Sequence, residues 1–166
     1  GARPAMASGL ATAHAPALDL PARFLAVGIL VLAGVAVTAP WVLPVMLGSF
    51  YAPPLLAFVH INTLGIIGAI ILGASYQLTP VILQVPLVSV GLARFSFWCY
   101  LGGIIALPLG LFRNWFPALL IGGTLLIIAF FLAVGIIGVT FHRAPVRDVV
   151  AWHLVSRETG KLSGRQ

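Results

Sequence analysis

His60 is the residue whose chemistry is hardest to explain by packing alone. It lies in a run from Pro53 to Leu83 that contains no charged side chain, PPLLAFVHINTLGIIGAIILGASYQLTPVIL. A run of this length and composition predicts a membrane-spanning helix. Because an imidazole is costly to bury in hydrocarbon, one kept there indicates a hydrogen-bond partner, a proton carrier or a metal ligand.

Small residues follow His60 along the same predicted helix, at Gly65, Gly68, Ala69, Gly73 and Ala74. In α-helical spacing His60, Leu64 and Gly68 share one face. A side-chain-poor face lets another helix or a planar macrocycle approach the backbone closely. The pattern predicts a cofactor site at His60, Leu64 and Gly68, with His60 as the metal ligand. The alternative is that the small residues only pack helices and His60 hydrogen-bonds a neighbour.

The other histidines are weaker candidates. His14 lies in an N-terminal stretch rich in alanine and proline, where we expect it to be solvated. His142 comes at the end of the fourth apolar run, where a cation is favourable without any further function. His153 lies on a short amphipathic segment and is a possible cofactor contact. Trp41, Trp98, Trp115 and Trp152 are expected to be interfacial anchors.

Little other chemistry is available to this chain. Its three acidic residues are Asp19, Asp148 and Glu158, and none falls inside an apolar run. Paired carboxylates, a Ser-His-Asp arrangement, a phosphate-binding glycine-rich loop and a cysteine cluster are all absent from the sequence. These absences argue against hydrolases, kinases and charge-lined ion channels. The single cysteine, Cys99, cannot form an intrachain disulfide.

Composition indicates an integral membrane protein. Of 166 residues, 61% are hydrophobic and only 7% are charged, whereas soluble domains carry about 25% charged residues. The net charge of +6 comes from basic residues near helix ends. Such placement suits an anionic lipid surface better than a nucleic acid, so the lipid bilayer is the expected partner.

Four apolar runs are long enough to cross a bilayer. They predict an all-α integral membrane four-helix bundle with a short amphipathic C-terminal segment. Residues 1–23 are expected to be a flexible cytoplasmic tail, 24–141 the membrane domain, and 142–166 a basic amphipathic and disordered tail. The predicted spans are about Phe24 to Leu47, Pro53 to Leu83, Phe95 to Phe112 and Trp115 to Phe141, with Arg113 and Asn114 forming a tight connection.

The C-terminal tail has its own apolar periodicity, at Val146, Val149, Val150, His153 and Leu154. This spacing predicts a short helix on the membrane surface. With four spans, both termini lie on one side, which then holds eight basic residues against Arg113 alone on the other. The positive-inside rule places both termini in the cytoplasm, here of a bacterial inner membrane. His60 would then lie about 10 Å into the bilayer from the outer side.

The segment HINTLGIIGAIILGASYQLTPVIL is similar to the second helix of proteins related to subunit I of the heme-copper oxidases. In that family a histidine opens the helix, small residues follow, and Tyr-Gln-Leu-x-Pro closes it in the oxidase-like branch. The matching positions here are His60, Gly65, Gly68, Gly73, Tyr76, Gln77, Leu78 and Pro80. The resemblance implies that His60 is an axial ligand of a low-spin heme b on the outer side.

The resemblance covers about Phe24 to Leu154, only the first four transmembrane helices of such a subunit. The family's second low-spin heme ligand and its oxygen-site ligands come from later helices, which this sequence does not contain. The chain alone is therefore not expected to reduce oxygen. We expect a heme b-binding electron-transfer subunit that takes its second ligand from another membrane subunit or a homo-oligomer. Alternatives are a non-catalytic structural or assembly subunit of a respiratory or photosynthetic complex, and a chlorophyll-binding subunit.

Overall fold

The computed structural model describes residues 19–46, 52–83 and 85–143, and every regular element in these ranges is helical. Four spans are long and apolar enough to cross a membrane. The predicted all-α four-helix fold is confirmed. The first span is α1 (Asp19–Met46); the second runs unbroken through α2 (Pro53–His60), the π-helix η2 (Ile61–Gly68) and α3 (Ala69–Leu83); the others are α4 (Val90–Arg113) and α5 (Phe116–His142).

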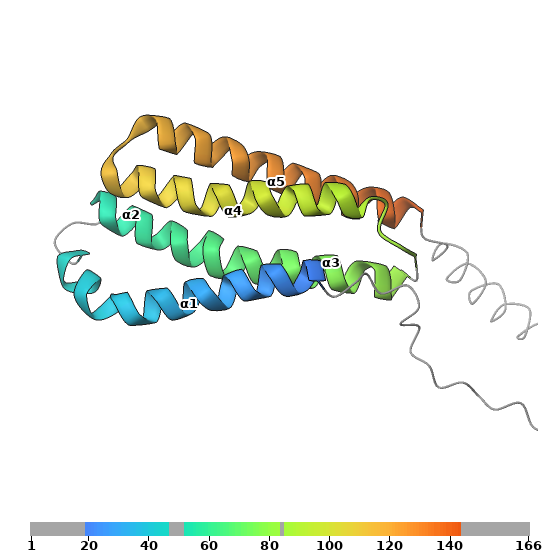
Figure 1. Ribbon diagram of the computed structural model, residues 1–166, viewed down its shortest axis with the longest axis horizontal. Helices are drawn as coiled ribbons and strands as arrows, with labels where there is room; N and C mark the ends of the chain where they lie inside the picture. Colours follow the sequence, from blue (N-terminus) through green and yellow to red (C-terminus); the bar gives the residue numbers. More distant parts are fainter. Residues whose placement is uncertain (1–18, 47–51, 84, 144–166) are drawn as a thin grey trace, which may run out of the picture.

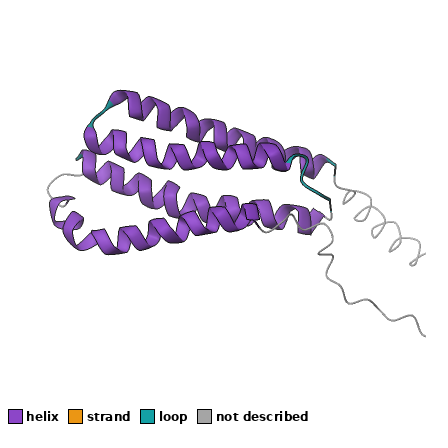
Figure 2. Cartoon of the chain, viewed as in Figure 1, coloured by secondary structure: helices purple, strands orange, loops and turns teal. Residues whose placement is uncertain are grey.

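The second span occupies the centre of the bundle. Its segments η2 and α3 contact α1. The segments α2 and η2 contact α4, and α3 also contacts α5. Figure 1 shows α4 and α5 lying together along their length, with α1 beside the second span. Figure 2 shows that only short connections in the described chain are not helical. The helix that carries His60 is therefore held by neighbours on both sides.

Glycines allow the closest helix contacts. A Cβ added at Gly65 would lie 2.9 Å from Cγ1 of Val31, so α1 packs directly against the backbone of η2. The α4–α5 pair is tighter still, because a Cβ added at Gly122 would lie 2.3 Å from the backbone nitrogen of Leu107. In lipid, where water does not drive helices together, such backbone proximity supplies van der Waals packing.

Aromatic side chains fill the interior where three spans meet. The ring of Phe24 in α1 lies 5.6 Å from Tyr76 in α3, and 5.0 and 5.4 Å from Phe97 and Tyr100 in α4. Phe24 and both tyrosines are completely buried. Tilted and edge-on contacts at these separations are the favoured arrangements of aromatic rings. The cluster fixes α1 and the second span against α4.

One buried hydrogen bond joins α3 to α4. The Ser96 hydroxyl donates to the carbonyl of Ala93 at 2.9 Å, so its proton is already used. The Tyr76 hydroxyl, 2.8 Å away, must then donate to Ser96 Oγ. Both side chains have their polar atoms paired inside an apolar bundle, where an unpaired hydroxyl is costly.

The first helix begins earlier than the sequence predicted, at Asp19 rather than Phe24. Residues 19–23, expected to be part of the flexible tail, are helical and lie within the first candidate span. Asp19 Oδ2 lies 3.5 Å from Arg23 and 3.2 Å from Arg94, which ties the start of α1 to the start of α4. A carboxylate in the first turn also suits the positive end of the helix dipole.

The third span also starts earlier, at Val90 instead of Phe95. The reason is a helix cap: the Ser89 side chain accepts the backbone N–H of Leu92 at 3.2 Å. Arg94 consequently lies in the second turn of α4, where its side chain reaches Asp19 of α1.

The predicted tight connection at Arg113 and Asn114 is confirmed. Asn114 ends α4 in the left-handed conformation with φ of 51°. The next backbone N–H, of Trp115, turns back to the carbonyl of Gly110 at 2.8 Å. Asparagine tolerates this conformation better than most residues, so a two-residue turn can reverse the chain here.

The described surface carries many large apolar side chains, among them Phe131 and Val134 of α5, which are 75% and 69% exposed. An apolar surface of this kind suits contact with a lipid bilayer. Most of the two predicted tails, 1–23 and 142–166, lies outside the described residues, which leave out 1–18 and 144–166 and with them the amphipathic segment from Val146 to Leu154.

Candidate functional site

His60 lies at the last position of α2, where the α-helix passes into η2, and its side chain is half-buried. Its Nδ1 is 2.7 Å from the carbonyl oxygen of Leu56. A carbonyl only accepts hydrogen bonds, so Nδ1 must carry the proton and donate. In the neutral ring Nε2 then keeps its lone pair. A histidine held in this way by a backbone carbonyl is prepared to ligate a metal through its other nitrogen.

The eight-residue π-helix after His60 was not predicted from the sequence. π-Helical segments are rare and occur frequently at functional sites. Three polar side chains near its start donate to backbone carbonyls one turn earlier: His60 to Leu56, Asn62 to Phe58 at 2.8 Å, and Thr63 to Val59 at 2.8 Å. These bonds compete with the backbone N–H groups that an α-helix would direct to the same carbonyls. The run His-x-Asn-Thr is the sequence signal for this irregularity.

Leu64 and Gly68, the other two predicted site residues, face α4 instead of an open surface. The hydroxyl of Tyr100 donates to the carbonyl of Leu64. The same hydroxyl lies 3.0 Å from where a Cβ of Gly68 would stand. Tyr100 thus fills the space that the sequence assigned to a flat ligand. A macrocycle would reach the Leu64–Gly68 face only if Tyr100 moved.

A second axial ligand for His60 is not evident among the described residues. His142 ends α5 and is exposed, at the opposite end of the bundle from α2 (Figure 1). His14 and His153 lie outside the described residues. Within 19–46, 52–83 and 85–143, no three metal-binding side chains come together. Any site at His60 therefore has one ligand from the described chain.

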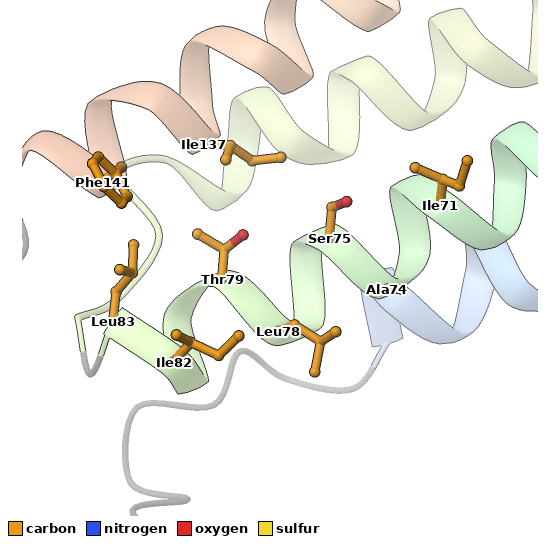
Figure 3. A pocket seen from close by; sticks show the side chains of 9 residues that line it. All are labelled: Ile71, Ala74, Ser75, Leu78, Thr79, Ile82, Leu83, Ile137 and Phe141. Atoms are coloured by element: carbon orange, nitrogen blue, oxygen red, sulfur yellow. The ribbon is translucent and has the colours of Figure 1, made fainter.

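A shallow pocket of about 470 Å³ lies between α3 and α5. Figure 3 shows the side chains of Ser75 and Thr79 on the face of α3 that is turned toward Ile137 and Phe141 of α5. These two hydroxyls are the polar groups of its lining, and the other side chains are apolar. A lining without a titratable group supplies no acid–base chemistry.

The four apolar spans define the chain as an α-helical integral membrane protein. Comparison with known proteins adds no closer identity, since no family model, curated protein or solved structure matches it.

Proposed function

We propose that this chain is a membrane subunit that binds heme b through His60 and carries electrons within a larger complex. The hydrogen bond from Nδ1 to the Leu56 carbonyl is the observation that supports it. That bond orients the ring and leaves Nε2 free to ligate iron. The resemblance of the second span to oxidase subunit I assigns the same role to the same residue.

In this proposal the bound heme supplies one-electron redox chemistry, and the chain positions it. Leu56 holds the imidazole in one tautomer, and the apolar spans exclude water from the ligand. A second ligand would be supplied by another membrane subunit or by a symmetry-related copy of this chain. His60 and that partner would hold the heme, because Tyr100 occupies the space beside Gly68.

The proposal places both termini in the cytoplasm and His60 in the outer half of the bilayer. Between Arg23 and Arg143 the sequence contains only two charged residues, Arg94 and Arg113. Arg94 pairs with Asp19 at the end where α1 begins, whereas Arg113 lies at the opposite end, in the α4–α5 turn. Reporter fusions are expected to place the C-terminus inside. A C-terminus on the outer side contradicts this orientation.

The test of heme binding is the absorption spectrum of the full chain purified with its native membrane partners. We expect a Soret band and a pyridine-hemochrome signal of a b-type heme, both lost in His60→Ala. His142→Ala is the matched control, because it removes an imidazole at the end of α5 and should leave the spectrum unchanged. Absence of both signals from the wild-type protein contradicts the proposal.

A second candidate is a non-catalytic subunit that packs against a respiratory or photosynthetic complex. The packing of Tyr100 over Gly68 favours it, since it leaves the predicted ligand-binding face closed. The same spectrum separates the candidates: a heme band, far-red chlorophyll bands, or no pigment. A pigment-free protein that runs as a stable monomer in mild detergent, without a co-purifying subunit, contradicts this second function.

A further inference from the structure

A long apolar groove runs between α1, α2 and α4, with a volume of about 690 Å³. Its walls include Val27 and Val42 of α1, Pro54 of α2, and Leu101 and Phe112 of α4. His60 does not line it, although its neighbours Ala57 and Ile61 do.

The groove offers nothing for a polar ligand to bind. The only polar side chain in its lining is Thr38. The Thr38 hydroxyl donates to the carbonyl of Gly34 at 2.8 Å, one turn earlier in the same helix. Its proton is therefore already used, and the lining as a whole selects an occupant made of hydrocarbon.

The length of the groove matches one leaflet of a bilayer. Along α4 it extends from Leu101 to Phe112, which is about 16 Å at 1.5 Å per residue. Half of a hydrocarbon core of about 30 Å is about 15 Å. Phe112 lies at the end of α4 and Leu101 near its middle. The groove thus runs from the membrane surface to about the bilayer midplane, as a lipid acyl chain does.

A positive charge stands at the surface end of the groove. Arg113 directly follows Phe112, and its side chain is exposed. From residue 24 to residue 142 the sequence contains no Asp or Glu, and Asp19 pairs with Arg23 and Arg94 where α1 begins, at the opposite end of the bundle from Arg113. Arg113 therefore has no acidic partner among the described residues, and in a membrane the anions nearest to a basic side chain at the end of a span are lipid headgroups.

We propose that the groove binds one acyl chain of an anionic phospholipid whose headgroup pairs with Arg113. The apolar lining matches a lipid acyl chain, and the length of the groove matches one leaflet. Arg113 supplies the positive charge for the headgroup. The bound lipid completes the surface between α1 and α4.

Gly34 offers a way to fill the groove without disturbing the protein. It lines the groove, yet a Cβ added to it would have no atom within 4 Å, so Gly34→Phe places a ring in the groove and not in the helix packing. Gly135→Phe is the matched control: Gly135 lies on the exposed side of α5, also has no atom within 4 Å of a Cβ, and is not part of the groove.

The full chain is reconstituted with equal amounts of phosphatidylglycerol and phosphatidylcholine, purified in mild detergent, and examined by native mass spectrometry. We expect one retained phosphatidylglycerol on the wild-type protein and on Gly135→Phe. Gly34→Phe should lose it. Arg113→Gln should lower the preference for phosphatidylglycerol over phosphatidylcholine by about fivefold, the effect of one basic residue near an anionic surface.

Each other outcome overturns the proposal. Equal retention by Gly34→Phe and Gly135→Phe means that the lipid is not held in the groove. If the wild-type protein retains phosphatidylglycerol and phosphatidylcholine equally, Arg113 does not select an anionic headgroup. If Gly34→Phe instead converts a wild-type dimer to a monomer, or releases a bound quinone, the groove belongs to a protein partner or another ligand.

Discussion

The close contact between α4 and α5 makes a quantitative prediction about Gly122. A Cβ at this position would lie 2.3 Å from the backbone nitrogen of Leu107, whereas ordinary contact begins at 3.4 Å, a difference of 1.1 Å. The obstacle is backbone and cannot rotate away. Gly122→Ala therefore moves α4 and α5 apart by about that distance, and a gap of 0.5–1 Å already forfeits a quarter to a half of the dispersion energy across it.

We expect Gly122→Ala to lower the free energy of unfolding by about 2 to 3 kcal/mol, in the upper part of the range for overpacked sites. The control is the neighbouring Gly123→Ala, because a Cβ at Gly123 has no atom within 4 Å. Both variants gain the same helix propensity from alanine, about 1 kcal/mol at most. The difference between them isolates the contact with Leu107.

The assay is reversible unfolding in mixed micelles, with SDS added stepwise to a mild detergent and helicity followed by circular dichroism. If Gly122→Ala and Gly123→Ala unfold at the same SDS fraction, α4 and α5 do not cross at Gly122, and the reasoning from backbone proximity is wrong.

Three further predictions concern polar groups and use the same unfolding assay. Ser96→Ala should lower the free energy of unfolding by about 2 kcal/mol, because it leaves the buried Tyr76 hydroxyl without an acceptor. Tyr76→Phe should lower it by only about 1 kcal/mol, because it removes that hydroxyl. A larger loss for Tyr76→Phe than for Ser96→Ala contradicts the assignment of Tyr76 as the donor. Asn114→Ala should lower the free energy of unfolding by about 1 kcal/mol, because alanine is strained in the left-handed conformation. Asn114→Gly should leave it unchanged, because glycine adopts that conformation freely. Equal losses in the two variants contradict the left-handed conformation of residue 114. Asp19→Ala should cost less than about 1 kcal/mol, and less again in high salt, because its bond to Arg94 is partly exposed; a loss independent of salt contradicts an ionic contact.

The spans could be predicted from sequence because their signals are local. An unbroken apolar run leaves the backbone no partner except itself, so a helix follows without knowledge of its neighbours. The Arg-Asn connection is similarly local. The helix starts were less accurate, because they depend on Ser89 as a cap and on the pairing of Asp19 with Arg94, which lies 75 residues away in sequence.

Some features of the candidate site could also be predicted from the sequence, and others could not. The sequence by itself determined that His60 is an imidazole inside an apolar span, since composition alone settles that question. Only the tertiary structure decided what covers the face that ideal helical spacing left open: Tyr100 of α4 lies against Leu64 and Gly68. The bond to Leu56 and the π-helix η2 arise within the span itself, where the His-x-Asn-Thr run is their local signal. The physical reason is that side-chain packing between distant segments is not encoded in any local pattern, whereas burial in lipid is.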